Sequence, residues 1–297
     1  MKKHIYLFVV LALIFISCEK KGEDKTKIYL DSNGVTVKCE YCTVGYKGII
    51  NGEEYEVVDD RSINLAMMMG GGKVCTSLVT DMSHLFQFRS TIPAIENWDV
   101  SNVSNMSYMF FESKMNQEIG YWDVSNVKDM TYMFGHSQFN QNIGNWDVSN
   151  VTTMENMFFD SQFNQPIGNW NVGKVNLMNR MFADSKFNQS IENWDVSSVT
   201  SMESMFSESQ FNQPIGKWNV EKVISMNGMF NMSQFNQPIG DWNVSNVRDM
   251  EVMFTISPFN QDISRWCVKN LNSEPDGFSM GPRLGEENKP HWGTCAN

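Results

Sequence analysis

At 297 residues the chain is long enough for two average domains, but a single repeated unit dominates it and favours one elongated body. The formal net charge is -11 at pH 7, and no cluster of lysine or arginine occurs in the repeats, which argues against a nucleic-acid-binding protein because phosphate binding needs clustered cations. The 20 phenylalanines, 22 methionines and 9 tryptophans are sufficient for a sizeable apolar core.

The first residues predict a secretory signal peptide, residues 1–17. Lys2 and Lys3 form a basic start, and the apolar run that follows is too short to span a bilayer as a helix, which takes about 20 residues. The run ends in Phe15-Ile-Ser-Cys18, which resembles the lipobox of bacterial lipoproteins with phenylalanine in place of the usual leucine. We therefore expect Cys18 to be lipidated, for example with palmitate, and residues 18–27 to be a flexible tether to a membrane of the bacterial cell envelope.

Residues 28–90 predict a β-rich N-terminal cap. Apolar alternation at Val35, Val37 and Cys39 indicates a strand, and Asn51-Gly52 between two apolar runs indicates a hairpin. Residues 61–69 are expected to form a short helix that ends at three consecutive glycines. A stack of repeats needs an atypical end of this kind, because its last unit would otherwise expose apolar surface.

Residues 91–266 contain a repeat of 24 residues, marked by one tryptophan in each copy. Valine, two methionines, phenylalanine, serine and asparagine follow the tryptophan at fixed spacings. Each unit is expected to bury its apolar face, including its tryptophan, only by stacking on its neighbours. The tryptophans are Trp98, Trp122, Trp146, Trp170, Trp194, Trp218, Trp242 and Trp266.

Within one copy, two apolar periods follow each other. From Ile119 to Val127 the apolar residues match the L-x-x-L-x-L-x-x-N spacing of a leucine-rich repeat and predict a short strand. From Val127 to Phe134 they recur every three or four positions, which predicts a short helix or 3₁₀ segment. The expected fold class is therefore an α/β repeat, an LRR-like solenoid of short parallel strands and short helices.

Two polar columns accompany the core. An asparagine recurs from Asn116 to Asn260, and we interpret it as a hydrogen-bonded ladder, with a ligand-binding role as the alternative. The residue after each of the first seven repeat tryptophans is Asp or Asn, for example Asp99 and Asn171. Because a calcium site requires concentrated carboxylate charge, a hydrogen-bonding role in a turn is favoured over calcium binding.

The motifs together resemble those of the BspA-like family of bacterial leucine-rich-repeat surface proteins. The resemblance rests on the recurring W-[DN]-V-S-x-V-x-x-M-x-x-M-F unit, on residues 74–83 and on the ending Trp292-Gly-Thr-Cys295. It implies a surface-exposed or lipid-anchored protein, and some relatives act as adhesins toward host matrix proteins. It implies no catalytic residue, because the family motif is a folding motif.

Chemistry-bearing motifs are scarce. After the signal peptide the histidines are His84, His136 and His291, and none lies in a recognisable catalytic or metal-binding motif. The methionine pairs are interpreted as adaptable core rather than a copper site. We therefore expect no enzyme activity, no metal and no cofactor.

The leading functional hypothesis is an adhesion or interaction module that binds proteins at the cell surface or in the host matrix through an extended face. One alternative is glycan binding, through the polar column around Asp99, Ser101 and Asn171 or through a partly exposed tryptophan. Another is a structural spacer without a discrete ligand.

The repeat decays after Trp266, so residues 267–297 are expected to cap the C-terminal end. An exported protein can keep cysteines oxidised, and we predict a disulfide between Cys267 and Cys295 across this cap. In the N-terminal cap we predict a bond between Cys39 and Cys75, leaving Cys42 free, although Cys42 is the alternative partner for Cys75.

Overall fold

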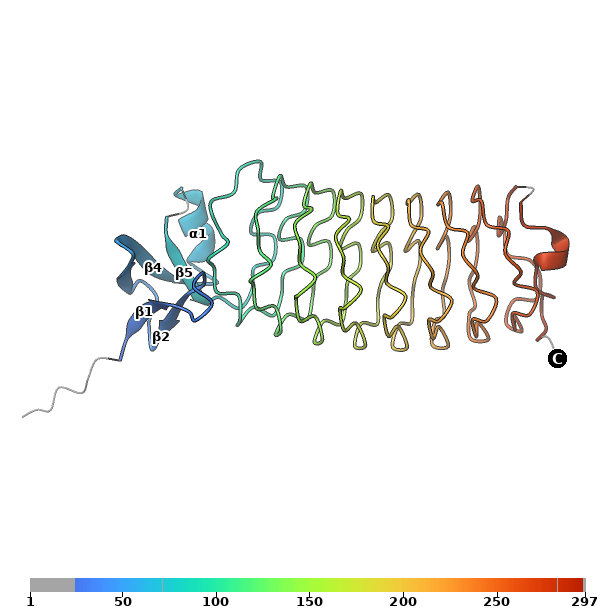
Figure 1. Cartoon of the computed structure of the whole chain (residues 1–297), viewed down its shortest axis with the longest axis horizontal. Coiled ribbons are helices and arrows are strands. Elements are labelled where there is room, and N and C mark those ends of the chain that lie inside the picture. Colours follow the sequence, from blue (N-terminus) through green and yellow to red (C-terminus); the bar gives the residue numbers. More distant parts are fainter. Residues whose placement is uncertain (1–24, 71, 282, 296–297) are drawn as a thin grey trace, which may run out of the picture.

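The computed structural model describes residues 25–70, 72–281 and 283–295. The predicted signal peptide, the lipidation site Cys18 and most of the tether lie outside these residues. The described chain forms a small β-rich unit followed by a long row of stacked coils (Figure 1). Each turn of the row is one 24-residue repeat, because parallel bridges join equivalent residues of successive copies, from Asp81↔Asn105 to Ser225↔Asp249.

The N-terminal unit contains five strands. β1 (Lys27–Leu30) pairs antiparallel with β2 (Val37–Glu40), β3 (Lys47–Ile50) pairs antiparallel with β4 (Glu53–Asp59), and β5 (Val74–Leu78) runs parallel to β4. β1 also lies against β3 and β2 against β5, so the strands surround a small core of their own. That core consists of Val37, Tyr55, Val57 and Cys75.

The β3–β4 hairpin turns at Asn51 and Gly52, where the sequence predicts it. Both residues have positive φ, 53° and 84°, as the tight two-residue turn requires. Helix α1 (Ile63–Met68) lies inside the predicted range 61–69 and buries Ile63 against the core of the stack. The cap is therefore continuous with the repeats.

The repeats themselves contain no helix and no extended strand between β5 and the short 3₁₀ helix η1 (Glu286–Asn288) in the part of the chain that the structure describes. In the methionine-rich segment of the first copy, turns follow one another, since the N–H of Met109 donates to the carbonyl of Met106 at 3.2 Å and that of Phe111 to Tyr108 at 3.2 Å. The residue between them bonds to the next coil instead, since the N–H of Phe110 donates to the carbonyl of Met133 at 3.0 Å. Backbone N–H groups thus alternate between closing a turn and joining two coils.

The prediction of an α/β, LRR-like solenoid of strands and helices is therefore wrong. A continuous helix would use its N–H groups within itself, but Tyr108 and Glu112 have φ of 58° and 51°, which interrupts any right-handed helix. Around Trp122 the chain likewise forms turns and not a strand. Consecutive turns bury every third or fourth side chain, as one face of a helix does, so the apolar spacing did not distinguish them.

Equivalent side chains stack on one another in the core. All eight repeat tryptophans are 1–3% exposed, and the Trp146 and Trp170 rings are nearly parallel with centroids 6.5 Å apart. Phe134 and Phe158 stack in the same way at 5.7 Å. The indole N–H of Trp170 donates to the carbonyl of Ile143 at 3.1 Å, so the polar atom of the buried ring is satisfied.

Candidate binding surface

The asparagine column is a ladder between successive coils. The side-chain oxygen of Asn116 accepts from the backbone N–H of Asn140 at 3.0 Å and from the amide of Gln141 at 3.2 Å. The arrangement repeats as far as Asn236 and Asn260, where the distance is 3.1 Å. These acceptor oxygens are consequently used within the chain, and the ladder holds the coils in register.

The Asp or Asn after each of the first seven repeat tryptophans closes a turn. The backbone N–H of Ser125 donates to Asp123 Oδ1 at 3.1 Å, and that of Gly173 donates to Asn171 Oδ1 at 3.2 Å. A carboxylate and an amide provide this oxygen equally well, which explains why both residue types occur in the column. The hydrogen bonds from Ser149 and Ser197 lower the pKa of Asp147 and Asp195, respectively.

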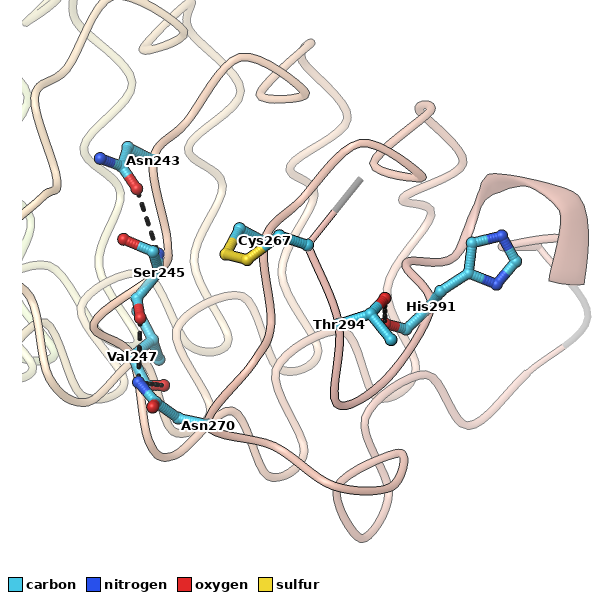
Figure 2. The surroundings of a disulfide bond; sticks show 8 residues. Asn243, Ser245, Val247, Cys267, Asn270, His291 and Thr294 are labelled. Carbon is cyan, nitrogen blue, oxygen red and sulfur yellow. Dashed lines mark hydrogen bonds between the residues drawn. A yellow bond between two sulfur atoms is a disulfide. The ribbon is translucent and has the colours of Figure 1, made fainter. Parts of the chain in front are cut away.

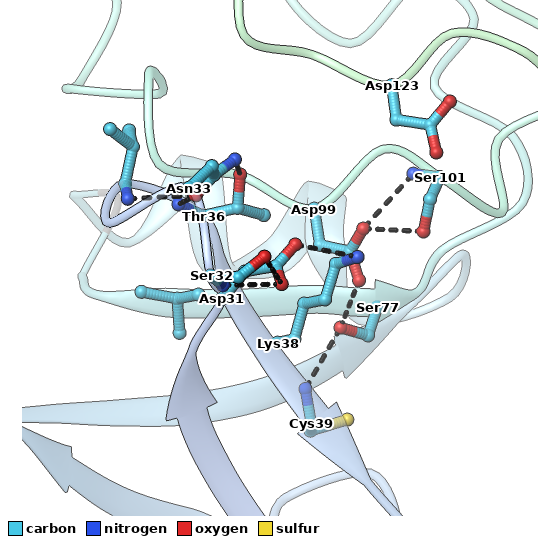
Figure 3. A network of polar contacts seen from close by, with 12 residues as sticks. Asp31, Ser32, Asn33, Thr36, Lys38, Cys39, Ser77, Asp99, Ser101 and Asp123 are labelled. Carbon is cyan, nitrogen blue, oxygen red and sulfur yellow. Dashed lines mark hydrogen bonds and ion pairs between the residues drawn. The ribbon is translucent and has the colours of Figure 1, made fainter.

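Asp99 joins the cap to the first coil (Figure 3). It is 4% exposed, and its carboxylate accepts from Ser77 Oγ at 2.5 Å and from Ser101 Oγ at 2.6 Å. Ser77 Oγ accepts in turn from the backbone N–H of Cys39 at 3.1 Å, and nearby Lys38 forms an ion pair with Asp31. The polar groups around Asp99 and Ser101 are therefore engaged in holding two parts of the chain together.

The structure contains the Cys267–Cys295 disulfide (Figure 2). Beside it, the N–H of Val268 donates to the carbonyl of Thr294 at 2.8 Å, so the chain end covers the last coil. Cys39, Cys42 and Cys75 are free thiols that share the core of the N-terminal unit. Burial raises the pKa of Cys75 and, with the neighbouring Cys75, that of Cys39. Their predicted pairing stays a prediction.

No group of His, Cys, Asp and Glu suited to a metal ion occurs among the residues that the structure describes. Among those same residues, no helix is long and apolar enough to cross a membrane. A hollow of about 380 Å³ lies near the C-terminal end, where Ile256, Pro258, Met280 and Arg283 line it together with small polar residues. It contains no histidine, cysteine or carboxylate.

The sequence varies widely at two columns whose backbone has positive φ in every copy, between 46° and 61°. The first left-handed column consists of His84, Tyr108, Tyr132, Asn156, Arg180, Ser204, Gly228 and Val252. The second left-handed column consists of Phe88, Glu112, His136, Asp160, Asp184, Glu208, Met232 and Ile256. Since the backbone repeats while these side chains change, the two columns give each coil its individual surface.

At the N-terminal end of these columns the side chains form an aromatic surface. His84, Tyr108 and Tyr132 stack in a row with centroids 4.9 and 4.8 Å apart. Phe111, between the columns, makes edge-to-face contacts at 5.3–5.7 Å with rings of both columns. We define the aromatic surface as His84, Phe88, Tyr108, Phe111, Tyr132, His136 and Phe159.

Part of the aromatic surface is exposed to solvent, and charged side chains lie beside it. Phe88 is 63% exposed, and His84 and His136 are also exposed. At the other end the guanidinium of Arg180 lies 4.5 Å from the centroid of the Phe159 ring. His136 Nδ1 lies 2.8 Å from an Asp160 carboxylate oxygen. Large exposed rings on a regular scaffold are a typical feature of contact surfaces.

Comparison with known proteins identifies a family. Three overlapping segments, residues 64–161, 113–211 and 183–289, match the family described as "Mycoplasma protein of unknown function, DUF285", and together they cover more than half of the chain. The chain belongs to the DUF285 family. No curated protein and no solved structure matches it. The DUF285 match begins inside α1 and extends to η1, so it comprises the repeats and parts of both caps.

Sequence reasoning did not single out the aromatic surface. The predicted candidates for ring stacking were the repeat tryptophans, and these are buried in this DUF285 chain. The available signal was the departure from the repeat pattern, because Tyr108 and Tyr132 stand where later copies have Ser204 and Gly228. This departure from the pattern indicates a surface only once the structure shows that the two left-handed columns lie on the same outer side of the stack.

Proposed function

We propose that this chain is a lipid-anchored protein of the bacterial cell envelope that displays its coils at the surface and binds other proteins there, as an adhesion or interaction module without enzyme activity. The signal peptide and the lipobox-like Cys18 support the location. The sequence resemblance to the BspA-like surface proteins supports the class of function. The observation that carries the proposal is the aromatic surface on a stack whose tryptophans and asparagine column are used for structure.

The physical argument is one of rigidity and composition. The coils are fixed by hydrogen bonds along both the backbone and the asparagine ladder, so the rings are held in place before any partner arrives. Preorganised rings lose little conformational entropy on binding, and aromatic residues are enriched at the energetic centre of protein interfaces. The buried tryptophans and the engaged Asp99 leave fewer groups for glycan binding along the predicted polar column.

The test compares bacterial cells that display the full chain with cells that display variants. Attachment to an immobilised extracellular-matrix protein preparation is measured. The Phe88→Ala/Tyr108→Ala variant is expected to reduce attachment about tenfold or more, since loss of a central interface ring costs at least about 1–2 kcal/mol. The matched control is Tyr121→Ala, because Tyr121 is 57% exposed on a different column.

Equal attachment of all variants would favour a spacer without a ligand. Attachment that is abolished when glycans are removed from the matrix preparation would favour the glycan alternative. Surface levels are checked by antibody labelling of intact cells, so that reduced display is not mistaken for reduced binding.

A further inference from the structure

We infer that the polypeptide recognised by the aromatic surface is a basic segment, whose arginine or lysine side chains bind between the exposed rings and a row of carboxylates beside them. The inference rests on the proposed function and specifies the chemistry of its partner. Three observations carry it: the charges in the second left-handed column, an arginine of this chain already placed on the surface, and an amide oxygen beside it that has no hydrogen-bond donor.

The second left-handed column continues from the aromatic surface as a row of acids. Glu112 stands in it between Phe88 and His136, and Asp160, Asp184 and Glu208 follow His136 in consecutive coils. Across both left-handed columns Arg180 is the sole lysine or arginine. Within the described residues none of Glu112, Asp184 and Glu208 forms an ion pair. Burial together with the neighbouring Glu208 and Asp160 raises the pKa of Asp184, as expected for carboxylates whose charge is not neutralised.

Arg180 shows how this surface accommodates a cation. Its guanidinium lies 4.5 Å from the Phe159 centroid, and Asp184 stands four residues further along the same coil. The attraction of Arg180 lowers the pKa of Asp184, although the acidic neighbours outweigh it. A ring and a carboxylate thus act on one guanidinium.

An orphaned acceptor adds to the negative potential of this region. Asn156 stands in the first left-handed column between Tyr132 and Arg180, is 8% exposed, and its side-chain oxygen has no hydrogen-bond donor among the described residues. Amide oxygens without a donor favour nearby positive charge. The whole chain carries a formal charge of -11, so a basic partner is also attracted at long range.

The ring orientations argue against a sugar as the principal ligand. A pyranose stacks on an open ring face, but both faces of Tyr108 are covered, by His84 at 4.9 Å and by Tyr132 at 4.8 Å. Arg180 shows instead that a guanidinium is bound over the Phe159 ring with the Asp184 carboxylate nearby, and the other acids supply the same charge complement.

The test measures fluorescence anisotropy of labelled peptides with the full chain purified in detergent. The probe is a short peptide of alternating arginine and glycine, compared with peptides that carry glutamate or serine in place of arginine. We expect saturable binding of the arginine peptide alone, weakening as salt is raised.

Three variants sharpen the test. The triple variant Glu112→Gln/Asp184→Asn/Glu208→Gln is expected to weaken binding about tenfold, because three charge contacts are lost. The control triple Glu96→Gln/Glu118→Gln/Glu221→Gln makes the same change in net charge at exposed positions on other columns and is expected to leave binding within about twofold. Arg180→Ala frees the Phe159 ring and is expected to strengthen binding about threefold.

Each contrary outcome has a separate meaning. If the glutamate or serine peptide binds as well as the arginine peptide, or if both triple variants weaken binding equally, the basic partner is ruled out while protein binding by the aromatic surface stands. Absence of arginine-peptide binding, with cell attachment still dependent on Phe88 and Tyr108, has the same consequence. Loss of ring dependence in the attachment assay rejects the proposed function itself.

Discussion

The residues of the two left-handed columns adopt a conformation that glycine tolerates best, yet Gly228 is the single glycine among them. β-branched residues are the least suited, because their second substituent at Cβ crowds the backbone when φ is positive. Ile256, with φ of 52° and 68% exposure, combines this strain with little buried contact. At Ile256 the strain of the left-handed backbone therefore outweighs the stabilisation that the side chain contributes by packing.

Replacing Ile256 by glycine should stabilise the chain. Relief of the left-handed strain is worth about 1–2 kcal/mol, and the greater freedom of glycine in the unfolded chain removes about half of that gain. We expect an increase of roughly 0.5–1 kcal/mol in the free energy of unfolding, measured by denaturant titration. The reciprocal change Gly228→Val should destabilise, since a Cβ there would lie 3.0 Å from Ser204 Oγ. A loss of stability in Ile256→Gly would show that its packing dominates.

A second prediction at this scale concerns Asp184 and pH. Burial, Glu208 and Asp160 raise its folded-state pKa, so the folded chain holds the proton more tightly than the unfolded chain. Stability from this group is thus greatest below the unfolded pKa and is lost as pH rises through the raised folded pKa. Asp184→Asn should therefore stabilise the chain at pH 7 and have little effect in acid. Thermal unfolding at both pH values is the measurement, with Asp195→Asn as the control, since hydrogen bonds lower the pKa of Asp195 and give the opposite sign.

At the scale of the element, one coil is a set of turns that has little stability alone. Its apolar side chains are buried against the same side chains of its neighbours, and alternate backbone N–H groups are satisfied by the next coil. A coil at the end of the row loses half of these partners, which is why both caps are required.

The disulfide fixes the C-terminal cap. On the chain-entropy treatment, closing the loop between Cys267 and Cys295 contributes roughly 3.5 kcal/mol. Cys267→Ser/Cys295→Ser is therefore expected to lower the free energy of unfolding by about that amount and to expose the last coil first, which hydrogen exchange detects near Val268. Uniform loss of protection along the whole row would contradict a local role for the cap.

The N-terminal cysteines permit an independent check on the same protein. Non-reducing peptide mapping of exported chain is expected to join Cys39 to Cys75 and to leave Cys42 free, since Cys39 lies on the apolar face of its strand and neighbours Cys75. A dominant peptide that joins Cys267 to any N-terminal cysteine would contradict two separately closed caps.

At the scale of the whole molecule, the coils form one long row beside the N-terminal unit (Figure 1), and the stacked rings of the aromatic surface belong to its first coils. The proposed lipid anchor on Cys18 would place this surface close to the envelope and the C-terminal cap away from it. A long basic partner would then lie along the row rather than at its tip.

The anchor itself is testable through Cys18. Cys18→Ala should move the chain from the detergent phase to the aqueous phase and should change the mass of the mature N-terminus, because the acyl chains are lost. Phase partitioning and mass spectrometry measure the two effects. Unchanged partitioning together with an unchanged N-terminal mass would exclude lipidation at this residue.

The sequence by itself determined the 24-residue period, the hairpin at Asn51-Gly52 and the C-terminal disulfide, because each depends on residue types at fixed spacing. The conformation of the coil was decided only by tertiary structure. A short helix and a chain of turns bury the same residues, and what separates them is whether backbone N–H groups bond within a coil or to the next one. The aromatic surface likewise depends on stacking, which brings Tyr108 and Tyr132, 24 positions apart in the sequence, to a ring distance of 4.8 Å.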